Sequence, residues 1–161
     1  MSNGIVPMPR RPRRAPLGRC SFRFDGRPHS VKDARAWLTA RMRIAGVPEE
    51  AAENAVLLLS ELATNSLAHS PSGAPGGTFT VRAFFSPGRL RIEVRDNGPA
   101  DFPLPTAPPN PEAEHGRGLL LVDALAHHWG RFDSDHGPGM FAELRWNTQP
   151  TPTTATGHSK R

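Results

Sequence analysis

The chain has 161 residues, the length of one globular domain that can bury its own hydrophobic core. A single cysteine excludes an internal disulfide and any multi-cysteine metal site. No run of about 18 apolar residues is present, and no apolar stretch follows the N-terminal arginines. We therefore expect neither a membrane span nor a secretory signal, and we favour a cytoplasmic location.

The net charge of +5 is unevenly distributed along the chain. Residues 1–24 contain six arginines, residues 148–161 contain one lysine and one arginine, and neither segment has an acidic residue. These ends hold a charge of +8, which leaves −3 for residues 25–147. A basic chain suggests a protein that binds nucleic acid. Because the body is mildly acidic, we do not favour direct binding of nucleic acid by the folded domain. The basic N-terminal arm could still contact DNA or an acidic partner.

Composition predicts one domain between two tails. Residues 1–18 are rich in arginine and proline, residues 148–161 are polar, and both have too few apolar residues to form a core. We predict that both tails are disordered. Residues 20–147 contain no internal repeat and are expected to fold as a single domain.

Periodicity within this domain predicts alternating and helical segments in a definite order. The expected elements are a strand at Cys20–Asp25, a helix from Ser30 to Ala45 with Gly46 as its stop, a helix from Pro48 to His69, a loop at 71–77, strands at 79–85 and 90–95 joined by a turn at 86–89, a loop at 99–111 with six prolines, a helix at Gly118–Trp129 and a strand at Met140–Trp146. This order predicts an α/β fold, a two-layer sandwich in which a mostly antiparallel mixed sheet carries the helices on one face.

Four polar residues interrupt the apolar second helix and share one narrow stripe of its surface: Asn54, Glu61, Asn65 and His69. Glu61 and Asn65 are four residues apart, so their side chains are neighbours. A carboxylate and an amide in this position could hold Mg²⁺ through oxygen ligands, and the carboxylate could accept a proton from a hydroxyl group. The alternative is a solvated polar stripe on an amphipathic helix.

Two glycine-containing motifs follow. Asp96-Asn97-Gly98 ends a predicted strand, so the carboxylate could lie at the floor of a pocket and accept a hydrogen bond from an amine such as that of adenine; the same residues are also a common turn signal. Gly116-Arg117-Gly118 opens the third helix, where backbone N–H groups could approach a phosphate. Arg117 could contact that phosphate or remain solvated.

The order and spacing of these motifs resembles the GHKL ATPase superfamily. Glu61-Leu-Ala-Thr-Asn65, Asp96-Asn97-Gly98 and Gly116-Arg117-Gly118 look like its N, G1 and G2 boxes. The strings LLLSELATNSLAHS and HGRGLLLVDALAHHWG are similar to the small single-domain branch, the anti-sigma-factor serine kinases of bacterial partner-switching systems. The resemblance extends over roughly residues 20–146.

This resemblance implies a Bergerat-type fold that binds ATP with Mg²⁺. Asn65 would coordinate the Mg²⁺ ion that bridges the phosphates, and Glu61 would act as general base toward a serine hydroxyl. Asp96 would hydrogen-bond the adenine amino group, with Gly98 leaving room for the base. The backbone amides of Gly116 and Gly118 would meet the phosphates, with Arg117 beside them, and residues 99–115 would form the lid over ATP.

The resemblance also implies the partners: a sigma factor, a STAS-domain anti-anti-sigma protein that is phosphorylated on serine, and a second copy in a homodimer. The chain departs from the family pattern at two places, and the second of these favours an alternative, a non-catalytic nucleotide-binding regulator that sequesters a protein partner. Ala100 stands where a second glycine is common. The run Gly137-Pro-Gly-Met140 lacks the lysine and threonine that many relatives have before the last strand.

Overall fold

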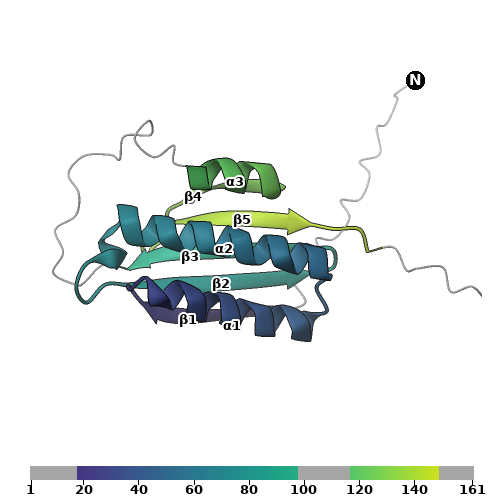
Figure 1. Cartoon of the computed structure of the whole chain (residues 1–161), viewed down its shortest axis with the longest axis horizontal. Helices are drawn as coiled ribbons and strands as arrows, with labels where there is room; N and C mark the ends of the chain where they lie inside the picture. Colours follow the sequence, from purple (N-terminus) through teal and green to yellow (C-terminus); the bar gives the residue numbers. More distant parts are fainter. Residues whose placement is uncertain (1–17, 98–116, 149–161) are drawn as a thin grey trace, which may run out of the picture.

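The computed structural model describes residues 18–97 and 117–148, which form an α/β sandwich (Figure 1). The elements in chain order are β1 (Gly18–Asp25), α1 (His29–Ala45), α2 (Glu49–His69), the 3-10 helix η1 (Pro71–Gly73), β2 (Thr78–Ser86), β3 (Arg89–Asn97), α3 (Arg117–Leu125), β4 (His128–Phe132) and β5 (Gly139–Arg145). The predicted two-layer α/β fold is confirmed.

One layer is a five-stranded sheet with the order β1-β2-β3-β5-β4. All four pairings between described strands are antiparallel. The sheet was expected to be mixed and mostly antiparallel, and its described strands contain no parallel pair. Helices α1, α2 and α3 form the second layer on one side of the sheet (Figure 1). The predicted hairpin is present as β2 and β3, and its turn contains Gly88 at φ +70°, a conformation that glycine adopts without steric cost.

The core lies between the sheet and α2, the central helix of the second layer (Figure 1). Alternating residues of β2 and β3 point toward the helices, and the register pairs Val81 with Val94. Both side chains are almost completely buried, as are Leu58 and Leu62 of α2. Because strand side chains alternate between faces, this arrangement leaves every second residue of the sheet on the helix-free side.

Helix boundaries follow from local chemistry with one difference. Gly46 ends α1 at φ +70°, and its N–H donates to Arg43 O at 3.2 Å, as expected for a glycine stop. The predicted N-cap Ser30 is wrong, because α1 begins at His29 after Pro28 and Ser30 lies buried within the first turn. No side-chain hydrogen bond caps this helix start among the described residues.

The third predicted helix is wrong in its second half. Helix α3 ends at Leu125, and His128–Phe132 forms strand β4. The backbone changes partners within two residues: Ala126 N–H donates to Val122 O at 2.8 Å, whereas His127 N–H donates to Glu143 O at 2.8 Å. Pairing with the edge of β5 that β3 leaves open thus outweighs the helical propensity of the apolar run. Sequence periodicity alone cannot detect this pairing, because it involves a distant segment.

The predicted disordered tails and the predicted loop at 99–111 fall almost entirely on residues 1–17, 98–116 and 149–161, which lie outside the described residues. Strand β1 begins at Gly18, two residues before the predicted start. Within the described ranges, no helix has the length and apolar character that crossing a membrane requires.

Replacement of Leu58 by Ala should lower the free energy of unfolding by about 2–5 kcal/mol, because it removes a side chain that is 0% exposed and leaves a cavity. Leu57→Ala on the same helix is the matched control, since Leu57 is 46% exposed and should cost about 1 kcal/mol or less. Urea denaturation measures both. Equal losses would contradict the described orientation of α2.

Candidate functional site

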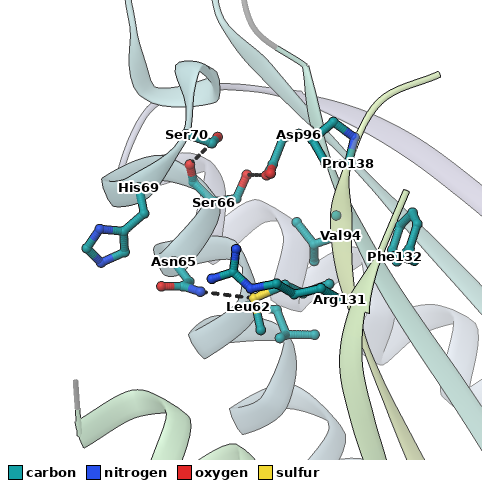
Figure 2. Close-up of a pocket in the computed structure, with 12 residues that line it drawn as sticks. Leu62, Asn65, Ser66, His69, Ser70, Val94, Asp96, Arg131, Phe132 and Pro138 are labelled. Carbon is teal, nitrogen blue, oxygen red and sulfur yellow. Dashed lines mark hydrogen bonds between the residues drawn. The ribbon is translucent and has the colours of Figure 1, made fainter. Parts of the chain in front are cut away.

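A cavity of about 80 Å³ lies between the C-terminal half of α2 and the ends of β3, β4 and β5 (Figure 2). Two predicted site residues line it, Asn65 from α2 and Asp96 from β3. Its volume is below the roughly 300–1,000 Å³ of sites for small molecules, so it accommodates part of a ligand of nucleotide size. Asp96, which lines the cavity, is the last residue but one before the chain continues into residues outside the described range.

Asp96 presents its carboxylate to this cavity from the end of β3. Its backbone N–H donates to Pro138 O at 2.8 Å, which anchors the strand end beside β5. Its Oδ1 accepts a hydrogen bond of 2.5 Å from Ser66 Oγ, which comes from α2. A carboxylate oxygen has a further lone pair, so this bond orients Asp96 and leaves it able to accept another donor.

The electrostatics of Asp96 combine opposing effects. Burial raises the pKa of its carboxyl group above the ordinary value of 3.8. Hydrogen bonds from Ser66 and Ser70 and the positive charge of Arg131 act in the opposite direction. In Figure 2 the Arg131 side chain extends from β4 along the cavity wall. A partly buried carboxylate held in this way is a strong acceptor for a neutral donor such as an amino group.

Asn65 lies one turn before the end of α2 and reaches across to the last strand. Its Nδ2 donates to Met140 Sδ at 3.0 Å, so its Oδ1 points away from Met140 (Figure 2). An amide oxygen is a ligand type that Mg²⁺ accepts. The described residues hold no group of three or more His, Cys, Asp or Glu side chains that could bind a metal alone. A cation held by this one amide oxygen would have to take its other ligands from phosphates and water.

Glu61 and Gly118 are in direct contact, although they belong to different helices. A Cβ atom added at Gly118, in the first turn of α3, would overlap Glu61 Oε2 and lie 3.2 Å from Glu61 Cδ. Glycine at 118 therefore leaves room for the Glu61 carboxylate in this position, and a larger residue there would require the Glu61 side chain to move. The structure thus brings the first and third sequence motifs together, one helical turn from Asn65.

The remaining predicted site residues have different positions. Gly98, Gly116 and the lid at 99–115 lie outside the described residues, and of Arg117 only the backbone is described, as the first residue of α3. His69 is exposed and lines the same cavity as Asn65. Asn54 lines a separate cavity with the end of α3 and residues 144–147, so the polar stripe of α2 does not form one site.

Sequence reasoning missed Ser66, Ser70 and Arg131. Ser66 directly follows Asn65 and so lies off the polar stripe, and only the tertiary fold brings it to Asp96. Arg131 lies in the segment that followed the predicted third helix. No alternation marked this strand in the sequence, because each side of it mixes apolar and polar residues: Trp129 with Arg131 on one side, and His128, Gly130 and Phe132 on the other.

The family model for the histidine kinase-like ATPase domain matches residues 24–146. The chain belongs to this family. Its five-stranded antiparallel sheet with helices on one side agrees with a GHKL-type ATPase fold, and domains of this family bind ATP, typically with Mg²⁺. An uncharacterised protein of Streptomyces coelicolor is 38% identical over 73 residues, which cover 45% of this chain and 67% of that protein.

The raised pKa of Asp96 predicts a pH dependence of stability with a definite sign. Since the folded state binds the Asp96 proton more tightly than the unfolded state, this group stabilises the fold at low pH, and the contribution is lost as pH rises from about 3.8 through the folded pKa. The free energy of unfolding of the wild type minus that of Asp96→Asn should therefore fall as pH increases.

Urea denaturation of both proteins between pH 4 and about pH 7 measures this difference, since other titrating groups cancel. Asp33→Asn, which removes an exposed carboxylate on α1, is the matched control. A difference that rises with pH would contradict the burial of Asp96.

Proposed function

We propose that this ATPase-family domain binds ATP with Mg²⁺ and acts as an anti-sigma factor and protein-serine kinase, with a serine of a STAS-domain protein as its substrate. Nucleotide binding is supported chiefly by one observation: Asp96 and Asn65, distant in sequence, line the same cavity. The finer proposal rests on the strings around Glu61 and Gly118, which are similar to those of anti-sigma-factor kinases.

Adenine selection would depend on Asp96. An ionised carboxylate only accepts hydrogen bonds, so Asp96 would favour the amino group of adenine over the carbonyl oxygen that guanine carries at the same place. Ser66 would hold the carboxylate in position through the bond already present. The proposed preference for ATP over GTP therefore follows from the donor and acceptor pattern at this carboxylate.

The phosphates would lie toward the start of α3. Asn65 would offer its Oδ1 to Mg²⁺, while the backbone amides at Gly116 and Gly118, with Arg117 beside them, would face the phosphate oxygens. When bound, ATP with Mg²⁺ supplies the transferable phosphoryl group and the cation that neutralises its charge. Glycine at 118 leaves room for the Glu61 carboxylate beside this helix start.

Glu61 would act as the general base. Its carboxylate lies against Gly118, where the phosphate end of the site is proposed, and is half-buried rather than freely solvated. It would accept the proton of the substrate serine hydroxyl as the serine oxygen bonds to the terminal phosphorus of ATP. The bond from that phosphorus to the rest of the nucleotide would break, and ADP would be the leaving group. Positioning and charge neutralisation would account for most of the rate.

The second candidate is a non-catalytic nucleotide-binding regulator that sequesters a protein partner. It is favoured by the contact between Asn65 Nδ2 and Met140 Sδ. Met140 ends the run 137–140, which has neither the lysine nor the threonine that many relatives have before the last strand. In this alternative Asn65 would be held by Met140 rather than by a cation. Nucleotide binding and phosphoryl transfer are therefore tested separately.

Isothermal calorimetry with ATP and Mg²⁺ tests nucleotide binding. Asp96→Asn should weaken ATP binding by about tenfold or more, since a hydrogen bond to a charged group contributes roughly 1.5–3 kcal/mol. Asn65→Ala should abolish the dependence of affinity on Mg²⁺. Asp33→Asn is the control for loss of a carboxylate. Wild-type affinity in Asn65→Ala would exclude the proposed role of this amide.

Glu61→Gln should reduce phosphoryl transfer by about 10²–10⁴-fold while ATP binding persists, because the amide cannot accept the serine proton. The assay is incubation with labelled ATP, Mg²⁺ and the cognate STAS protein. Glu53→Gln, an exposed glutamate two turns earlier on α2, is the matched control. If wild-type protein binds ATP and transfers no label, the kinase proposal fails and the non-catalytic regulator stands.

A further inference from the structure

Strand β1 forms one edge of the sheet (Figure 1). All eight of its residues pair with β2 on one side, in an unbroken register from Gly18 opposite Phe85 to Asp25 opposite Thr78. Among the described strands, none pairs with its other side. Such an edge presents backbone N–H and C=O groups to which a further strand can bond. β1 has neither a proline nor a bulge that would oppose this pairing.

An exposed aromatic side chain lies along this edge. The register places Phe22 opposite Val81, on the side of the sheet that the helices cover, yet Phe22 is 52% exposed. Its ring centre lies 4.8 Å from that of Phe24 and 6.5 Å from that of Trp37 on α1. Covering Phe22 from the edge would remove aromatic surface from water, which favours association. The edge therefore offers an apolar contact in addition to backbone hydrogen bonds.

The helix-free face of the same strand carries charges of both signs. Its exposed side chains on this face are Arg19, Ser21, Arg23 and Asp25. Arg19 and Asp25 stand near opposite ends of the strand, and neither forms an ion pair within residues 18–97 and 117–148. Because one end is basic and the other acidic, two copies that run in opposite directions bring unlike charges together.

We propose that β1 pairs antiparallel with β1 of a second copy of this chain, with Phe22 opposite Phe22 of that copy. A twofold axis perpendicular to the sheet keeps the helices of both copies on one side and pairs residues at equal distances from the axis. With the axis at Phe22, Arg19 lies opposite Asp25 of the second copy. Ser21 lies opposite Arg23. Opposed side chains have Cβ atoms about 4.5–5.5 Å apart, which permits an ion pair.

Neighbouring registers are less favourable. An axis one residue earlier, at Ser21, sets Arg19 opposite Arg23, and an axis one residue later sets Arg23 opposite itself. Both bring like charges together, which is destabilising. An axis two residues away on either side sets Phe22 opposite a glycine and shortens the paired segment. One register therefore combines unlike charges with the aromatic contact, and a symmetric interface requires this self-complementarity.

This pairing leaves the candidate nucleotide site open. The cavity is lined by residues of α2, β3, β4 and β5, whereas β1 lies at the other edge of the sheet, beyond β2. The five described strands of each copy would join into one continuous sheet. The proposal therefore does not depend on ATP binding or on kinase activity, and it is tested without nucleotide.

Sedimentation equilibrium of the full chain over a series of concentrations measures the monomer–dimer equilibrium. Arg19→Asp sets two carboxylates opposite each other at both ends of the paired segment and should raise the dissociation constant by about tenfold. Asp25→Arg sets two cations there and should have the same effect. Lys32→Asp makes the same charge change as Arg19→Asp at an exposed position of α1 and should change the constant by less than about twofold.

An equimolar mixture of the Arg19→Asp and Asp25→Arg proteins should restore association. In the mixed dimer the two carboxylates of one copy face the two cations of the other, so the dissociation constant should return to within about threefold of the wild type. A mixture that associates no better than either variant alone would overturn the proposal. A wild type that stays monomeric at every concentration would assign the edge to a strand of another protein and would also overturn it.

Oxidative cross-linking tests the register. In a Cys20→Ser background, Phe22→Cys should form a disulfide between copies when an oxidant is added, because directly opposed Cα atoms lie about 4.5–5.5 Å apart. Ser21→Cys in the same background is the control, since its two copies would lie about 8 Å apart along and across the strands, too far for a disulfide. Cross-linking through Ser21→Cys and not through Phe22→Cys would overturn the proposed pairing.

Discussion

Burial of helix α2 against the sheet is the constraint on which the rest of this domain depends. Leu58 and Leu62 are removed from water by packing on β3 and β5, so the helix can take only one rotation about its axis. That rotation directs Asn65 toward β5, Ser66 toward the end of β3 and Glu61 toward α3. Hydrophobic packing thus aims the polar side chains of the candidate site.

The polar contacts that result are few and specific. Asp96 would be costly to bury alone, because a carboxylate loses its hydration inside a protein. The hydrogen bond from Ser66 and the positive charge of Arg131 offset part of that cost from two different elements. A carboxylate whose pKa is raised by burial, yet which is oriented by neighbours, is typical of functional sites. This is the physical basis of the proposed recognition of adenine.

Strand β3 links two surfaces of different chemistry. Its alternate residues face the core and the candidate site, while those between them face the open side of the sheet, where arginines surround two buried glutamates. Because Arg95 and Asp96 are adjacent, both surfaces meet at the same strand end.

The amino-acid sequence by itself determined the elements whose periodicity is strong and the motifs whose spacing is local. The strands of the hairpin, the two long helices and the neighbouring pair Glu61 and Asn65 follow from local patterns, since residues three or four apart on a helix share a face. The family match to residues 24–146 agrees with these motifs.

Tertiary structure decided whatever depends on contacts between distant segments. Residues 128–132 became β4 because β5 offered a free edge, and this brought Arg131 to the cavity. The pairing of Ser66 with Asp96 and the approach of Gly118 to Glu61 join residues from different elements. Local propensity carries no information about such pairs, because their free energy arises only when the chain has folded.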